Sequence, residues 1–245
     1  MVDGGGAGAV LIDLIRAVGE TGSTNADMLA LAATGAVEGS WLRADRQTAG
    51  KGRQGRAWQS PPGNLYASTL VRLRPADPVA ATLALVTVVA LEATVATFLP
   101  AGATIKWPND LLIDRAKLSG VLLERMGDVV VIGIGVNLAH APDLPDRPAT
   151  SLRARGVDVA PGMFLDVLAD GFARWLARWR GEGLEPVRRR WLERAHPVGT
   201  ALSVRMPDGE RIDGLFDGLD PGGALNLRLA NGARRVIHAA DVFLI

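Results

Sequence analysis

Hydrophobic and polar residues repeat along the chain with two different periods, which predict a mixture of helices and strands. At residues 23–35, Ser23 or Thr24 can cap a helix whose apolar residues follow at helical spacing, and Gly35 can end it. The helical period returns at 162–180, where large apolar residues recur every three or four positions. That spacing is typical of a helix with one face on a core.

Residues 79–99 form a long segment that carries a single charged residue, Glu92. Its length would nearly suffice to span a bilayer. The segment is rich in Ala and Thr, however, and no basic residues flank its C-terminal end. We therefore expect a helix buried in the core of the protein, and no membrane association.

Strands are expected in several runs rich in β-branched and apolar residues. A strand at 64–73 follows a Pro-Pro-Gly turn, and a short one at 39–48 precedes it. Three further runs lie at 104–114, 117–126 and 128–138. The junctions between these last three are too short for crossover helices, so they predict hairpins and an antiparallel or mixed sheet.

The last 50 or so residues differ in character from the rest of the chain. Short alternating runs are separated there by the turn sequences PDGE, DPGG and ANGA, which is typical of a small β-barrel. We place a domain boundary near Pro197, giving a larger domain at 1–197 and a β domain at 198–245. The predicted fold class is α+β.

The amino-acid composition excludes several classes of function. The chain has 245 residues, 48% of them hydrophobic, and a formal net charge of +1, so no general attraction to nucleic acid or membrane is expected. The absence of cysteine excludes disulfides, thiol nucleophiles and thiolate metal sites, and it suits the cytosol. Three scattered histidines do not suggest a zinc site. Residues 1–10 are glycine-rich without a basic region, so we expect a flexible start and no signal peptide.

The stretch GKGRQGRAW at 50–58 has glycines at the spacing of a dinucleotide fingerprint. That fingerprint needs a buried strand before it and a helix after it. Here the polar run RADRQTA precedes the glycines, and Pro61 and Pro62 exclude a helix after them. A phosphate-binding P-loop is excluded as well, because the ending G-K-[ST] is missing.

What remains is a glycine-rich loop with three cations. Glycines allow backbone N–H groups to approach an anion, and lysine or arginine can neutralise a carboxylate or phosphate. We expect the loop to be disordered alone and to order around an anionic ligand. Local chemistry equally allows a solvent-exposed basic turn. The residues concerned are Gly50, Lys51, Gly52, Arg53, Gly55 and Arg56.

A nucleic-acid-binding module is an alternative of a different class. It would use Arg53, Arg56 and the arginines at 174–194, and it would bind DNA or RNA with a steep salt dependence. The near-neutral net charge argues against it. We expect those other arginines to form a solvated face: Arg174, Arg178, Arg180, Arg188, Arg189 and Arg190.

Four separated stretches of the sequence favour a ligand-binding loop over a solvent-exposed basic turn. They are STN at 23–25, RQTAGKGRQGRAW at 46–58, KWPNDLLI at 106–113 with KLSG at 117–120, and GIGVNL at 133–138. In this order and at these intervals, the chain resembles the biotin protein ligases. Two positions depart from the usual family pattern: Lys51 stands where arginine is frequent, and Ser119 stands where alanine is frequent.

The resemblance implies a mixed α/β catalytic domain related to class II aminoacyl-tRNA synthetases, followed by an SH3-like barrel. Only about 20 residues precede STN, too few for the N-terminal DNA-binding domain of some family members. We therefore expect the ligase-only type, without DNA binding. The implied substrates are biotin and ATP with Mg²⁺, and the implied partner is the biotin carboxyl carrier domain of a biotin-dependent carboxylase. A cytoplasmic location and a possible homodimer are also expected.

The implied reaction forms biotinyl-5′-AMP and passes the biotinyl group to a lysine of the carrier. Lys117, Arg53 and Asp110 are the expected catalytic residues. Lys117 would bridge the biotin carboxylate and the α-phosphate, Arg53 would hold the adenylate phosphate, and Asp110 would be a base or orienting group for the amine. The metal ligands stay open. Expected biotin contacts are Ser23, Thr24, Asn25, Gln47, Lys51, Gly52, Arg53 and Lys117; expected nucleotide contacts are Gly50, Lys51, Arg53, Arg56, Trp58, Asn109, Lys117 and Asn137.

Each of these assignments has a purely structural alternative. Ser23 and Thr24 could serve as helix caps, and Trp58 could be an ordinary core residue. Asp110 could be a turn former after a proline, and Lys117 a surface lysine at a strand end. The nearest functional alternative is a lipoate ligase or octanoyl transferase, which shares the catalytic fold.

Overall fold

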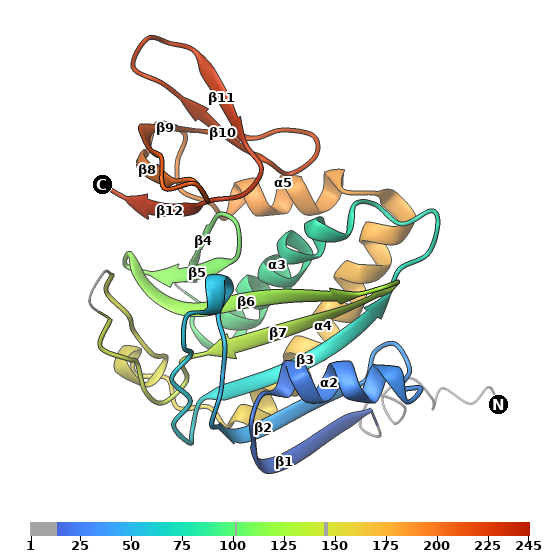
Figure 1. The fold of residues 1–245 in the computed structure, drawn as a ribbon. Coiled ribbons are helices and arrows are strands. Elements are labelled where there is room, and N and C mark those ends of the chain that lie inside the picture. Colours follow the sequence, from blue (N-terminus) through green and yellow to red (C-terminus); the bar gives the residue numbers. More distant parts are fainter. Residues whose placement is uncertain (1–13, 101, 145–146) are drawn as a thin grey trace, which may run out of the picture.

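The structure is a computed structural model that describes residues 14–100, 102–144 and 147–245. The expected flexible start at 1–10 lies outside the described residues. A seven-stranded sheet and a smaller five-stranded sheet are joined by helices (Figure 1). This confirms the α+β class with a mixed sheet and a C-terminal β unit. The large sheet contains β1 (Ile15–Thr21), β2 (Trp41–Gln47), β3 (Leu65–Arg72), β4 (Thr104–Lys106), β5 (Asp110–Ile113), β6 (Ala116–Met126) and β7 (Val129–Val136).

The strand order of the large sheet is β1-β2-β3-β7-β6-β5-β4. Strands β1 and β2 are parallel and every other neighbouring pair is antiparallel, as expected for hairpins. The predicted run at 104–114 is not one strand, because a turn with a cis Trp107–Pro108 peptide bond divides it into β4 and β5. Strand β1 was not predicted, because its largely exposed side chains lack a clear alternating pattern.

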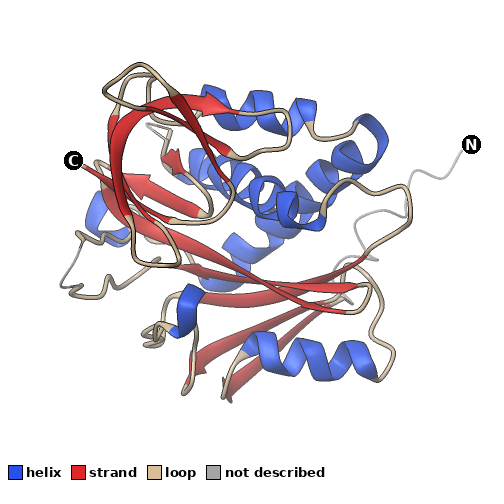
Figure 2. Ribbon diagram, turned by 45° about the horizontal axis from the view of Figure 1, so that its top comes forward, coloured by secondary structure: helices blue, strands red, loops and turns tan. Residues whose placement is uncertain are grey.

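The two faces of the large sheet are covered differently. Helix α2 (Thr24–Ala33) lies on one face, and the longer helices α3 (Leu83–Phe98) and α4 (Pro161–Glu182) lie on the other (Figure 2). Met28 of α2 packs against Leu42 and Val131 in a small separate cluster. Because α2 covers only part of its face, the remainder of that face is left open for a cleft.

Helix α3 is buried on nearly all sides, and this explains its continuous apolar sequence. The segment Ala80–Phe98 is long and apolar enough to cross a membrane by composition alone. Most of it is covered by α4, α5 (Glu185–Glu193) and the sheet. It therefore has the burial of a core helix, as the sequence predicted.

The C-terminal unit is an antiparallel sheet in the order β11-β10-β9-β8-β12. Helix α5 joins it to the larger unit, and Trp191 of α5 packs on Phe216 with ring centroids 6.2 Å apart. The Trp107 indole donates a hydrogen bond of 3.0 Å to the Gly223 carbonyl. The strands are β8 (Ala201–Arg205), β9 (Arg211–Leu219), β10 (Leu225–Arg228), β11 (Arg234–Ile237) and β12 (Asp241–Leu244).

The arginines of α4 and α5 are not a uniform solvated face, so that expectation was partly wrong. The side chains of Arg174 and Arg178 are exposed, as predicted. Arg180 is only 12% exposed, and it forms ion pairs with Glu38 and Asp77. Helical spacing could not predict this, because both carboxylates come from loops far away in the chain.

Candidate functional site

A cleft opens on the sheet face beside the N-terminus of α2. The space within it is about 1360 Å³, a volume that includes solvent at its open mouth. Its walls come from the glycine loop after β2, the β4–β5 turn, β6, β7 and β12. The cleft is lined by every predicted site residue except Gly50: Ser23, Thr24, Asn25, Gln47, Lys51, Gly52, Arg53, Arg56, Trp58, Asn109, Asp110, Lys117 and Asn137.

Gly50 has a structural reason to be glycine. A Cβ atom at this position would lie 2.8 Å from the Trp58 carbonyl oxygen and 2.9 Å from Gln47 Nε2. A side chain there would therefore displace the start of the loop. Gly50 shapes the wall of the cleft from behind without lining it.

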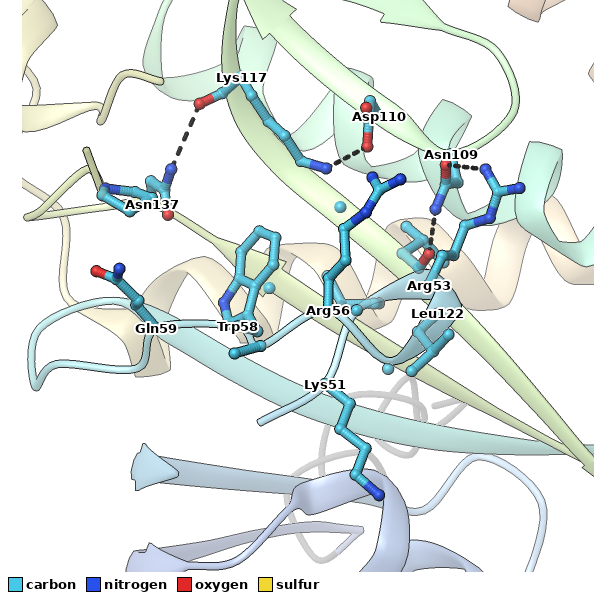
Figure 3. A pocket seen from close by; sticks show the side chains of 18 of the residues that line it. Lys51, Arg53, Arg56, Trp58, Gln59, Asn109, Asp110, Lys117, Leu122 and Asn137 are labelled. Atoms are coloured by element: carbon cyan, nitrogen blue, oxygen red, sulfur yellow. Dashed lines mark hydrogen bonds and ion pairs between the residues drawn. The ribbon is translucent and has the colours of Figure 1, made fainter. Parts of the chain in front are cut away.

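Asp110 lies at the centre of a buried group of opposite charges. Its carboxylate is 2.5 Å from Lys117 Nζ and 2.8 Å from Lys106 Nζ, and Figure 3 shows the Lys117 side chain pointing at it. Arg147 Nη1 lies 4.0 Å from the same carboxylate. Lys106 also donates to the Val242 carbonyl of β12 at 3.0 Å. Sequence reasoning gave no role to either cation: Lys106 was only the first position of the KWPNDLLI stretch, and Arg147 lies outside all four stretches.

These neighbours set the ionisation of the cluster. Burial opposes ionisation of Asp110, but the ammonium groups of Lys106 and Lys117 outweigh it and hold the pKa of Asp110 well below its usual range. Burial also lowers the pKa of Lys117, with Lys106 and Arg147 acting in the same direction and Asp110 opposing them. Asp110 is therefore a carboxylate at neutral pH. Its low basicity favours the orienting role over the base.

The glycine loop places its cations unequally. Arg53 donates to Asn109 Oδ1 at 3.3 Å and to the Ala240 carbonyl at 3.1 Å. Arg56 forms an ion pair with the buried carboxylate of Asp241 at the start of β12. The Lys51 side chain points away from this group (Figure 3). Two of the three cations therefore meet the C-terminal unit at the edge of the cleft; the predicted disorder of the free loop stays a prediction.

Trp58 follows the loop and lies on a floor of glycines. A Cβ atom at Gly135 would be 2.5 Å from the indole, and one at Gly120 would be 3.3 Å from it. Lys117 Nζ lies 5.6 Å from the ring centroid. The indole Nε1 is buried and has no hydrogen-bond partner within the described part of the chain. Trp58 is thus a wall of the cleft, and an aromatic face is available to a ligand.

The end of the cleft at α2 is polar and neutral. Gln47 Oε1 accepts hydrogen bonds of 2.9 Å from Thr24 N and 3.1 Å from Thr24 Oγ1. Ser23 is the N-cap of α2 by position, but within residues 14–100 its side chain makes no capping hydrogen bond. The capping alternative is therefore not supported for Ser23, whose side chain borders the cleft instead.

The two asparagines that were expected to contact a nucleotide also form hydrogen bonds between neighbouring segments of the cleft wall. Asn109 Nδ2 donates to the Val121 carbonyl at 2.5 Å, and Asn137 Nδ2 donates to the Thr150 carbonyl at 3.1 Å. These bonds hold both side chains in place at the cleft. Among the residues that the structure describes, no group of three or more histidines and acidic residues could hold a metal ion.

Comparisons with known proteins show which family this chain belongs to. The Biotin/lipoate A/B protein ligase family matches residues 24–137, and the Biotin protein ligase C terminal domain matches residues 203–245. A biotin–(acetyl-CoA-carboxylase) ligase of Paracoccus denitrificans is 43% identical over 91% of this chain and 97% of its own length. One from Mycobacterium tuberculosis is 36% identical, covering 98% of this chain and 91% of its own.

Solved structures agree with the fold. The biotin protein ligase from Aquifex aeolicus in complex with biotin and ATP has a TM-score of 0.83 at 24% identity, covering 94% of this chain and 99% of its own. The biotin protein ligase from Leishmania major in complex with biotinyl-5-AMP has a TM-score of 0.67 at 26% identity, covering 92% and 98%. Sheet, cleft and C-terminal unit define a small-molecule-binding catalytic domain of the ligase type. The chain belongs to the biotin protein ligases of the biotin/lipoate A/B protein ligase family.

Proposed function

We propose that this protein activates biotin with ATP and transfers it to a lysine of a carboxylase carrier domain. The observation that carries the proposal is the division of one cleft into two chemically different ends. Thr24 and Gln47 offer paired hydrogen-bonding groups at one end, and Arg53 and Arg56 offer positive charge at the other. Lys117 lines the same cleft and supplies an ammonium group for the junction of two anions, the biotin carboxylate and the ATP phosphate.

In the first step, a carboxylate oxygen of biotin attacks the α-phosphorus of ATP. The new P–O bond gives biotinyl-5′-AMP, and pyrophosphate leaves. Both reactants are anions, so their approach requires positive charge at the reacting atoms. Lys117 supplies it, and the ion pair with Asp110 holds its ammonium in place. Mg²⁺ would enter with the triphosphate as Mg-ATP, because few acidic residues face the cleft.

In the second step, the amine of the carrier lysine attacks the acyl carbon of the mixed anhydride. The C–N bond forms, AMP leaves with the electron pair of the broken C–O bond, and the proton lost by the amine nitrogen is released to the solvent. Asp110 would orient the amine through a hydrogen bond, since its depressed pKa suits a hydrogen-bond acceptor better than a general base. The glycine loop would cover the adenylate and exclude water.

Finer features of the family belong to the same proposal. We expect the large sheet to be of the class II aminoacyl-tRNA synthetase type and the C-terminal sheet to be an SH3-like barrel. We also place the domain boundary near Pro197, in the segment between α5 and β8. The cytoplasmic location and the possible homodimer remain expectations of this proposal.

The test is to incubate the protein with biotin, Mg-ATP and a carrier domain, and to weigh the carrier by mass spectrometry. A mass gain of one biotinyl group is expected. Parallel reactions contain lipoate or octanoate in place of biotin, because the neighbouring branch of the family is the alternative. Modification by lipoate and not by biotin would contradict the proposal.

A further inference from the structure

One cation of the cleft has no part in the reaction described above. Arg147 lies in the segment between β7 and α4, outside the four motif stretches of the sequence. Its side chain is only 17% exposed, and it lines the cleft together with the residues already assigned to the reaction. Its charge therefore adds to theirs at the place where anions are expected to meet.

The backbone that follows Arg147 is fixed to Lys117. Lys117 N donates to the Pro148 carbonyl at 2.8 Å, and Thr150 N donates to the Lys117 carbonyl at 2.9 Å. These two bonds form a short parallel bridge between Lys117 and Ala149. Arg147 therefore directly precedes a segment whose register against the proposed catalytic lysine is fixed.

The guanidinium of Arg147 contacts groups on two sides. Its Cζ atom lies 5.3 Å from the ring centroid of Phe243 on β12, which is within the range of a cation–π contact. Its Nη1 atom lies 4.0 Å from the Asp110 carboxylate, which is an ion pair too long for a hydrogen bond. The same carboxylate contacts Lys117 Nζ at 2.5 Å. The guanidinium and the ammonium are therefore neighbours around one carboxylate.

This position suits a phosphate that Lys117 also contacts. A guanidinium presents its N–H donors in one plane, and it commonly holds a phosphate through two parallel hydrogen bonds. Because Arg147 and Lys117 both contact Asp110, a phosphate group bound at the ammonium comes within reach of the guanidinium. The phosphate concerned is the α-phosphate, which meets the biotin carboxylate and stays in the cleft after pyrophosphate leaves.

We propose that Arg147 binds the α-phosphate of the nucleotide and retains the adenylate between the two steps, and that Phe243 is its positioning residue. The proposal rests on the proposed function, which supplies ATP and the adenylate. It gives the C-terminal unit a further part in the site, because the ring on β12 holds one of the cations of the cleft.

The experiment compares Arg147→Ala with Arg205→Ala. Arg205 of β8 contacts the same Phe243 ring, with its Cζ atom 5.4 Å from the centroid, but it does not line the cleft. Arg205→Ala is thus the matched control for loss of a guanidinium from this ring. For Arg147→Ala we expect the KM for ATP in adenylate formation to rise about tenfold or more, because a charge-assisted hydrogen bond is lost. Since biotin carries no phosphate, its Kd in isothermal titration calorimetry should stay within about twofold.

The second measurement is the rate at which preformed biotinyl-5′-AMP leaves the protein, followed by rapid gel filtration. Release from Arg147→Ala should be about tenfold faster or more, since a lost contact acts mainly on the dissociation rate. Arg205→Ala should retain the adenylate like the unaltered protein. Arg147→Lys keeps the charge without the planar fork, so both of its values should fall between those of the unaltered protein and Arg147→Ala.

Two changes at position 243 test the positioning role. Phe243→Leu removes the ring and leaves the guanidinium, and it should raise the KM for ATP about threefold. Phe243→Tyr keeps an aromatic ring and should restore the KM of the unaltered protein. The same KM in Phe243→Leu and Phe243→Tyr would show that the ring does not position Arg147.

Three outcomes would overturn the role of Arg147. The first is an unchanged KM for ATP in Arg147→Ala. The second is an equal change in Arg205→Ala, because the two arginines would then only support the ring. The third is an unchanged rate of adenylate release, which would exclude the α-phosphate. Failure of the proposed function looks different, because the unaltered protein then forms no adenylate from biotin and ATP.

Discussion

Single residues in the cleft have roles that depend on their charged neighbours. Lys117 stands out because burial, Lys106 and Arg147 lower its pKa, while the Asp110 carboxylate opposes them and pairs with its ammonium. Asp110 is the matching case, since two ammonium groups hold it ionised where burial would neutralise it. Neither residue is explained by a solvent-exposed strand end or by a turn.

Replacing Lys117 with alanine should abolish adenylate formation. The ammonium lines the cleft in which the two anions would meet, and losing such a stabilising charge costs about 10²-fold or more in rate. Adenylate formation is measured by pyrophosphate release. The control is Arg125→Ala on the exposed end of β6, which should react normally. Near-normal turnover of Lys117→Ala would refute the assigned role.

Replacing Asp110 with asparagine should lower the free energy of unfolding by about 3 kcal/mol at pH 7, because it leaves buried ammonium groups uncompensated. The pKa of Asp110 is lower in the folded state than its value of about 4 in the unfolded chain. The ionised carboxylate therefore contributes fully to the free energy of unfolding above about pH 4, and this contribution is lost as the pH falls toward the pKa of the folded state. The deficit of the variant should therefore be about 1 kcal/mol smaller at pH 3. Urea unfolding at pH 7 and at pH 3 measures the loss of stability in the variant. An equal loss at both pH values would contradict this account.

At the scale of elements, the cleft exists because β7 and β6 carry glycines where other strands carry side chains. Gly133 and Gly135 face the same side as Val131, which is covered by α2. Past the end of α2, small residues leave room for Asn25 and Trp58. A single strand thus forms a hydrophobic contact at one end and a ligand floor at the other.

Replacing Gly135 with alanine should displace the Trp58 indole, because the new methyl group would lie 2.5 Å from it. We expect the KM for ATP to rise and the protein to stay folded, as the indole can move toward the open cleft. Adenylate kinetics and circular dichroism measure the two effects. Gly181→Ala in α4, with nothing within 4 Å of the new Cβ, should change neither. Unaltered kinetics in Gly135→Ala would show that the indole position is unimportant.

At the scale of the molecule, the C-terminal unit takes part in the cleft as well as packing beside it. Asp241 pairs with Arg56, and the carbonyls of Ala240 and Val242 accept from Arg53 and Lys106. Helix α5 holds this unit against α3. There the fully buried Glu92 meets Arg190 at 2.9 Å and Arg194 at 3.3 Å.

Replacing Arg190 with alanine should destabilise the whole molecule by about 3 kcal/mol, because the Glu92 carboxylate then has one cation fewer and no route to water. Arg189→Ala is the matched control, since Arg189 is the exposed neighbour on the same helix. Chemical denaturation compares the two variants. Similar stabilities would mean that the Glu92 pair does not hold α5 in place.

Much of the site was predictable from the sequence. The residues proposed to carry the chemistry stand in short motifs, and the periods of apolar residues predict the elements that hold them. Strand β1 and helix α5 were not found, because β1 is largely exposed and α5 is short and arginine-rich. The side chains behind the motif residues were missed too, since Ser68 and Glu124 look like ordinary strand residues.

The sequence by itself determined which elements form, which motif residues carry charge, and which residues are small enough to leave a cleft. These depend on local spacing, which a linear pattern records. Only the tertiary structure decided which distant groups meet: Asn25 with Glu124, 99 positions away, and Arg56 with Asp241, 185 positions away. Such pairs depend on strand register and on the packing of the C-terminal unit, and both are set by the whole chain at once.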